Sequence, residues 1–367
     1  MLSPKRRAQA KDIYRRLPAV GPIAIDALQR RRHPARREPA HLNVMTSLGG
    51  DDADVLQVML LSLSQSHSGD QIDFWLFHLT LSQDKLRDLA AFCDRLPNLT
   101  LHVIAVQERK DFAQLSKLGS RPFGARFLWY IAHQYLPETM DRVLYLDPLD
   151  TLVTDDLLPF ATQPLLGNYV AACREVPITP PVLSGPVPEA HAKGMPNYRL
   201  RRICAGIFNS GAMVIDLQRL RKDGIGLQPY LRTAAWAQEK GLEFGDQGLY
   251  SLTHGSNYLR AHDRYNYRFH DFPRDFTPAV VHFAGRIAKP FHLRLTAEQE
   301  GQIRDHLTAT GDRALRINPF QTIKAEDMVY YRQWWEVCAQ TPVFDRIAPI
   351  AAEYTDHVLK GPRLPLF

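Results

Sequence analysis

Two carboxylates stand directly after an apolar run at residues 143–151, Val-Leu-Tyr-Leu-Asp-Pro-Leu-Asp-Thr, and this is the segment best suited to chemistry. In open α/β sheets, ligands bind outside the carboxyl ends of the strands, so acids at such an end face a ligand. Asp147 and Asp150 offer the hard oxygen ligands that Mg²⁺ or Mn²⁺ takes, and such an ion can neutralise a diphosphate. The alternative is that the Asp-Pro pair only forms a turn after the strand.

A second polar group follows another apolar run far along the chain, in the sequence Val-Val-His-Phe-Ala-Gly-Arg-Ile-Ala-Lys-Pro. His282 ends the apolar run, Gly285 lets the backbone approach a ligand, and Lys289 is suited to gripping a phosphate. Alternatively, a histidine that ends a strand is a hydrogen-bonded structural residue. Taken together, the two groups form a more specific pattern than either one does alone.

The elements that must position these residues alternate between strand and helix from residue 41 onward. Short apolar runs between amphipathic helices predict an α/β fold with a mostly parallel, Rossmann-like sheet covered on both faces. We expect strands at 42–46, 72–79, 99–106, 142–146 and 206–217, and helices at 55–66, 82–96, 125–135 and 229–240. Past about residue 295 the alternation stops, and helices at 296–308 and 325–339 predict a helical C-terminal extension.

The basic charge of the chain is concentrated at its N-terminus. The net charge is +6, but residues 1–41 hold 11 Lys and Arg against 3 Asp and Glu, net +8, so the rest of the chain sums to −2. Residues 1–40 therefore form a basic arm, which could dock on anionic lipid or an acidic partner, or stay solvated. Because the arm lacks interleaved aromatic residues and no nucleic-acid-binding module follows it, we expect no nucleic acid partner.

Cysteine spacing and the length of the apolar runs indicate the cellular compartment. Four cysteines without paired spacing predict reduced thiols in a cytosolic protein. No apolar run approaches the 18 residues that a membrane-spanning helix needs. We therefore expect a cytoplasmic protein, soluble or held peripherally at the inner face of the membrane.

In combination, these patterns resemble glycosyltransferase family 8, the retaining nucleotide-sugar transferases with the GT-A fold, related in architecture to lipopolysaccharide galactosyltransferases and glycogenin. Five segments match in order, and they are 42–52, 125–126, 143–153, Phe208-Asn209-Ser210-Gly211, and Asp246-Gln247 with the closing residues 282–289. The resemblance implies a GT-A nucleotide-sugar transferase domain over residues 41–295, between the basic arm (1–40) and the helical C-terminal extension (296–367).

The resemblance also implies the metal site. Asp147 and Asp150 stand where the family's Asp-x-Asp motif holds Mn²⁺, or Mg²⁺, on the donor diphosphate, and His282 would complete the protein ligands. Gly285 and Lys289 would contact the phosphates.

Further substrate contacts are implied in the same way. Asp51 or Asp52 would touch the base or ribose, and Arg126 matches the family's donor-binding arginine. Alternatively, the two aspartates could cap the helix that begins near residue 55, and Arg126 could form a surface ion pair.

The resemblance places the remaining residues at the reacting sugar. Asn209 and Gln247 would face the sugar, while Asp246 and Glu175 would hold its hydroxyls. In the alternative interpretation, Asn209 belongs to a tight turn.

One departure from the family pattern concerns the two acids, which Pro148 and Leu149 separate where the family has one residue. A strictly extended chain would point Asp150 away from Asp147. Since proline cannot donate to a sheet ladder, the segment could instead bulge or turn and bring the second acid back.

The expected function is that of a retaining hexosyltransferase. It would move a hexose from a nucleoside diphosphate sugar, expected to be UDP-linked, to a glycan or lipid-linked acceptor. The Pro-rich stretch 176–200 could close over the donor. The alternative is a non-catalytic nucleotide-sugar-binding or scaffold protein of the same family with an impaired metal site.

Overall fold

The computed structural model describes residues 20–34, 38–50, 52–119, 124–175, 208–255, 257–269, 276–285, 287–319 and 321–360, with the single residues 192 and 194. Three predictions fall largely or wholly outside these residues, namely the lid at 176–200, the arm up to residue 19, and the role of Asp51.

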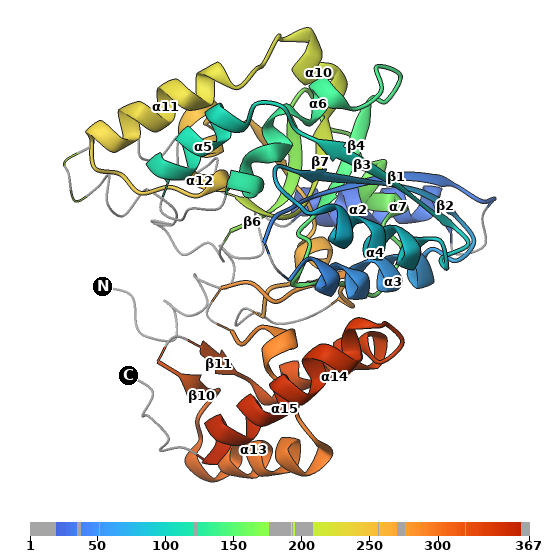
Figure 1. Cartoon of the computed structure of the whole chain (residues 1–367), viewed down its shortest axis with the longest axis vertical. Coiled ribbons are helices and arrows are strands. Elements are labelled where there is room, and N and C mark those ends of the chain that lie inside the picture. The colour runs from blue at the N-terminus through green and yellow to red at the C-terminus, as the bar shows by residue number, and fades with distance from the viewer. Residues whose placement is uncertain are drawn as a thin grey trace.

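A seven-stranded sheet of order β3-β2-β1-β4-β7-β6-β8 lies at the centre of the molecule (Figure 1). Its strands run parallel except β7, which is antiparallel to both of its neighbours, β4 and β6. The predicted mostly parallel sheet is thereby confirmed. The strands are β1 (His41–Leu48), β2 (Gln71–His78), β3 (Leu99–Ala105), β4 (Arg142–Leu146), β6 (Val170–Arg174), β7 (Phe208–Asp216) and β8 (Tyr258–Arg260).

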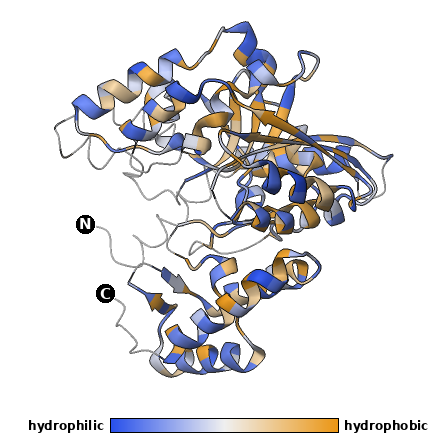
Figure 2. Cartoon of the chain, viewed as in Figure 1, coloured by the Kyte–Doolittle hydropathy of each residue, from blue (hydrophilic) through white to orange (hydrophobic). Residues whose placement is uncertain are grey.

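Helices cover both faces of this sheet, as Figure 1 shows. One face carries α3 (Leu56–Ser66), α4 (Gln83–Cys93) and α7 (Leu158–Ala161); the other carries α5 (Arg109–Leu118), η3 (Gly124–Ile131), α6 (Ala132–Tyr135), α10 (Leu217–Lys222), α11 (Gln228–Glu239) and α12 (Asp246–His254). Hydrophobic residues concentrate in the strands, whereas the helices mix hydrophobic and hydrophilic residues (Figure 2). Both sides of the sheet are therefore buried, as the continuous apolar runs predicted.

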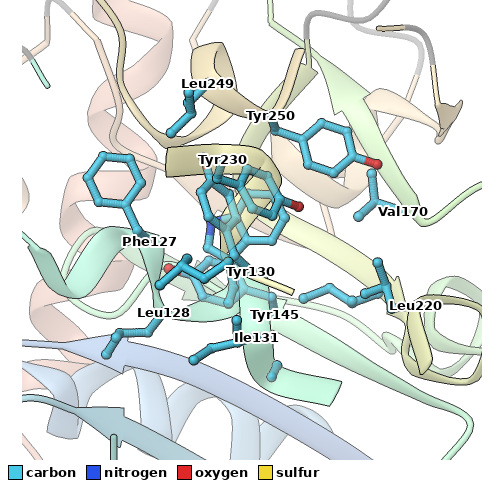
Figure 3. Close-up of a cluster of buried hydrophobic side chains, with 14 of the residues drawn as sticks. Phe127, Leu128, Tyr130, Ile131, Tyr145, Val170, Leu220, Tyr230, Leu249 and Tyr250 are labelled. Atoms are coloured by element: carbon cyan, nitrogen blue, oxygen red, sulfur yellow. The ribbon is translucent and has the colours of Figure 1, made fainter. Parts of the chain in front are cut away.

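The single α-helix predicted at 125–135 is largely wrong, because most of this segment is the 3-10 helix η3 and only its last turn, α6, is α-helical. Five successive side chains from Phe127 to Ile131 are buried there, between the sheet and α5. Their aromatic rings join the cluster in Figure 3, where Tyr130 stacks on Tyr230 with ring centroids 3.8 Å apart. This core supports the start of α12, because the indole of Trp129 donates to the Asp246 carboxylate at 3.2 Å.

The C-terminal region packs on the same side as α3. It comprises α13 (Ala297–Thr310), the hairpin of β10 (Leu315–Asn318) and β11 (Gln321–Ile323), α14 (Met328–Cys338) and α15 (Val343–Lys360). Buried Trp334 shares a core with Val58 of α3, and Arg346 forms an ion pair with Asp54 at 2.7 Å. Two predicted helices are present, but the hairpin and α15 were not predicted; the domain boundary at 295/296 remains a prediction.

Two further observations bear on the sequence predictions. Cys93, Cys173 and Cys338 are buried free thiols, and Cys204 lies outside the described residues. Within the described ranges, the search for a helix able to cross a membrane finds none.

Candidate metal and sugar site

The segment after β4 turns back on itself and brings Asp150 to Asp147. The Asp147 N–H donates to the Gly211 carbonyl of β7 at 2.9 Å, and the Thr151 hydroxyl donates to the Asp147 carbonyl at 2.5 Å. Strand β5 (Thr151–Val153) then pairs antiparallel with β9 (Val280–His282), with Thr151 opposite His282. The expectation for an extended chain is therefore wrong here, because this long-range pairing sets the direction of the backbone.

The three predicted metal ligands converge as a result. His282 Nε2 lies 3.4 Å from Asp147 Oδ2 and 3.3 Å from Asp150 Oδ1. One ligand atom from each residue lies within 4.8 Å of the other two. The histidine is buried, whereas 39% of the Asp147 side chain stays accessible, so a ligand can reach the group from the Asp147 side.

The charges in this group act strongly on one another. Burial, and then repulsion from Asp150, raises the pKa of Asp147. Burial would also raise the pKa of Asp150, but the charges of Lys289 and His282 outweigh it and lower that pKa. Asp150 is therefore a firmly ionised carboxylate. The positive charge near Asp147, by contrast, is too small to offset the effects that raise its pKa.

A hydrogen-bond chain that starts at a backbone N–H fixes the tautomer of His282. The Gly211 N–H donates to Asn209 Oδ1 at 3.0 Å, and this oxygen also accepts from Asn266 Nδ2 at 2.8 Å. Asn266 Oδ1 is therefore the atom 3.0 Å from His282 Nδ1, and it accepts the Nδ1–H. The other ring nitrogen, Nε2, is left to face the two carboxylates.

These residues fit a divalent cation. His282 Nε2 is buried and has no hydrogen-bond partner within the described part of the chain. Burial lowers the pKa of His282, but the two carboxylates outweigh it and raise the pKa, so a proton is held where a cation would bind. Two carboxylates and one oriented imidazole form a donor set suited to Mn²⁺ or Mg²⁺.

Gly211 makes room for the imidazole. A Cβ at this position would lie 2.0 Å from both Cε1 and Nδ1 of His282, far closer than real atoms approach. The glycine of the Phe-Asn-Ser-Gly segment is therefore required for the histidine to occupy its place. The segment lies within β7, so the interpretation as a tight turn is wrong.

Beside the metal group lies a second network centred on Glu175. Its Oε2 accepts from Asn209 Nδ2 at 2.8 Å and from Gln247 Nε2 at 2.9 Å, and Arg268 Nη1 lies 3.0 Å away. The Gln247 Oε1 atom in turn accepts from the Ser210 N–H at 3.3 Å. Because an ionised carboxylate can only accept hydrogen bonds, Glu175 holds the N–H₂ group of each amide toward itself, and the amide oxygens of Asn209 and Gln247 point away from it.

The predicted phosphate contacts lie next to the cation site. Lys289 forms an ion pair with Asp150 and donates to the Phe283 carbonyl at 2.7 Å. Gly285 is exposed and has φ +86°, a left-handed conformation that favours glycine. Whether either residue contacts phosphate stays a prediction.

Two other predicted residues have identified surroundings. Arg126 is half-buried, with its guanidinium 4.8 Å from the centroid of the Phe127 ring. Asp52 makes no side-chain cap for the 3-10 helix that follows it; its carboxylate lies 3.5 Å from Arg346. Their proposed contacts with the donor remain predictions.

A similar cluster, His67 with Asp70 and Asp156, has a structural role. His67 Nδ1 bonds to Asp70 at 2.8 Å, and Nε2 accepts from the Leu157 N–H at 3.0 Å. Both ring nitrogens are occupied, which leaves no lone pair for a metal.

Two functional residues were missed from the sequence, Asn266 and Arg268. Both lie in the polar run Arg-Tyr-Asn-Tyr-Arg at 264–268 and both are buried. Its alternation of polar and aromatic residues just before the segment that carries His282 was the available signal.

Comparison with known proteins agrees with this geometry. The sequence model of glycosyl transferase family 8 matches residues 44–293, more than half of the chain, so the chain belongs to this family of glycosyltransferases. Members of the family typically use a divalent metal ion. No curated protein matches the chain.

Solved structures share the fold at low identity. A galactosyltransferase, LgtC, in complex with donor and acceptor sugar analogues is 18% identical, with 74% of this chain and 96% of that chain covered and a TM-score of 0.52. The bifunctional glycosyltransferase WbbM is 16% identical, with 87% and 53% covered and a TM-score of 0.58. These similarities establish the GT-A fold.

Proposed function

We propose that this protein is a metal-assisted, retaining glycosyltransferase that moves a hexose from a UDP-linked sugar to a hydroxyl of a glycan or lipid-linked acceptor. The observation that carries the proposal is the convergence of Asp147, Asp150 and His282 from two distant segments. The site geometry gives no support to the scaffold alternative, because the wider spacing of the two acids still brings them to one point.

The metal-site residues and Lys289 would act on the leaving group. A bound Mn²⁺ or Mg²⁺ ion would supply Lewis-acid stabilisation of the diphosphate as the anomeric C–O bond breaks. Asp147, Asp150 and His282 would hold the ion, and Lys289 would release Asp150 to contact a phosphate oxygen.

The Glu175 network holds the two amides that would face the sugar. An amide is a poor nucleophile, so Gln247 would orient the sugar instead. The acceptor hydroxyl would attack from the face of the departing diphosphate and give its proton to the diphosphate oxygen released from the anomeric carbon, which retains the anomeric configuration. We propose that Asp246 holds sugar hydroxyls and that Arg126 binds the donor. One of Asp51 and Asp52 would contact the nucleoside.

A screen of nucleotide sugars tests this function. We expect one donor class to raise the melting temperature in Mn²⁺ and to undergo slow hydrolysis, because a ligand at 100 times its Kd adds about 2.7 kcal/mol of stability. Chelation of the metal should remove both effects. Donor binding that is independent of Mn²⁺, with no hydrolysis and no transfer, would instead favour the scaffold.

The role of Glu175 can be tested separately. In Glu175→Gln an amide N–H₂ replaces an acceptor, so the orientations of Gln247 and Asn209 are no longer fixed. We expect kcat to fall roughly 10- to 100-fold with a smaller change in KM. Glu300→Gln is the matched control, since the Glu300 carboxylate likewise pairs with an arginine, Arg332, but lies in the C-terminal region. An unchanged kcat for Glu175→Gln would contradict the positioning role.

A further inference from the structure

Helix α2 (Val20–Arg32) turns two polar side chains, together with the partly buried Pro22 and Ile25, toward the protein, and several apolar side chains toward solvent. Asp26 and Gln29 are buried, whereas Val20, Ile23 and Leu28 are 60%, 46% and 48% exposed. Three of the seven exposed large hydrophobic side chains among the described residues thus lie on this one helix. A helix that only covered the core would have the opposite pattern.

The exposed apolar residues form one continuous stripe. Val20, Ile23, Ala24, Ala27 and Leu28 are all exposed and follow the spacing i, i+3, i+4, i+7, i+8, which places them on one face. The stripe is therefore an exposed apolar surface along one side of the helix.

Specific contacts hold this orientation. The Tyr265 hydroxyl is hydrogen-bonded to the Asp26 carboxylate, and His33 Nε2 lies 2.9 Å from the Thr162 hydroxyl just past the end of α7. Tyr265 itself stacks on Phe160 of α7, with ring centroids 4.6 Å apart. Figure 1 shows α2 close to α7. The apolar stripe is thus fixed outward by the buried Asp26 contact and by an exposed hydrogen bond at His33.

The charges next to the stripe indicate what covers it. Arg30, Arg31 and Arg32 are exposed at the C-terminal end of α2. Residues 1–41 carry net +8, while the rest of the chain sums to −2. An apolar face beside dense positive charge complements a surface with an apolar interior and anionic head groups.

We propose that the outward face of α2 docks on an anionic lipid bilayer, with Val20, Ile23 and Leu28 inserted at the head-group boundary and the arginines on the lipid phosphates. This goes beyond the sugar-transfer proposal and does not depend on it. Docking at this face would hold the protein at the surface where a lipid-linked acceptor resides.

Vesicle sedimentation of the full chain tests this. The wild type should bind vesicles of phosphatidylglycerol and phosphatidylcholine, and bind much less to phosphatidylcholine alone or in about 1 M salt. The double variant Ile23→Asp with Leu28→Asp should bind about tenfold more weakly or less, because charge replaces the inserted side chains. Ile350→Asp is the matched control, since Ile350 is 60% exposed on α15, and it should bind as the wild type does.

Each other outcome overturns the proposal. Undiminished binding by the double variant would mean that the basic residues bind lipid without α2. A wild-type dimer that the double variant converts to a monomer, without vesicle binding, would mean that a second copy of the chain covers the stripe. Unfolding of the double variant is checked by its melting temperature, and Arg30→Glu with Arg31→Glu then gives an independent test with the same expected loss.

Discussion

Replacing Asp147 with alanine is expected to lower sugar transfer by roughly 10³-fold or more, because about 4 kcal/mol of leaving-group stabilisation would be lost with the cation. In the absence of metal, the Asp147→Ala variant should be at least as stable as the wild type. Burial and Asp150 raise the pKa of Asp147, so its ionised form at neutral pH is disfavoured in the folded state, and removing it relieves this cost.

Melting curves with and without Mn²⁺, together with transfer rates, measure both effects. Asp147→Ala should lose the Mn²⁺-induced rise in melting temperature that the wild type shows. The control is Asp156→Ala, in the cluster where both nitrogens of His67 are occupied. Because the Asp156 carboxylate accepts from the Leu158 N–H at 2.8 Å, this variant should lose roughly 1 kcal/mol of stability yet keep its response to Mn²⁺. Near-normal transfer by Asp147→Ala would rule out the metal role.

The sheet was predictable from the sequence because its central strands are buried on both faces and their apolar runs stand out. The expected strand at 142–146 matches β4, and the helix expected from residue 82 is α4, which Ser82 caps by accepting the Lys85 N–H at 3.4 Å. Helix α15 was harder to predict, since Pro349 lies inside it and proline normally ends a helix.

The site was harder to predict from the sequence than the sheet. Its ligand types were predictable, but Asp147 and His282 lie 135 positions apart, and only the family resemblance placed them together. Local rules for an extended chain failed at Asp150 because the β5–β9 pairing overrides them. Asn266 and Arg268 act through other side chains, and such supporting contacts leave little trace in a single sequence.

Gly211→Ala should impair metal binding even though every metal ligand is still present. The added Cβ would lie 2.0 Å from the His282 ring and 2.9 Å from Asn209 Oδ1, so the imidazole must move out of its place beside the carboxylates. Displacing an oriented ligand typically costs 10- to 100-fold in metal affinity, and overpacking costs about 1–3 kcal/mol of stability. Calorimetric titration with Mn²⁺ and a melting curve measure the two effects.

Gly301→Ala on α13 is the matched control for this glycine substitution. A Cβ there meets nothing within 4 Å, and alanine favours a helix interior, so stability should rise by up to about 1 kcal/mol with no change in Mn²⁺ affinity. Since Gly211 does not have a positive φ, strain in the backbone cannot account for a loss in Gly211→Ala. Wild-type Mn²⁺ affinity in Gly211→Ala would show that the His282 ring does not need its place against β7, and would remove the imidazole from the proposed ligand set.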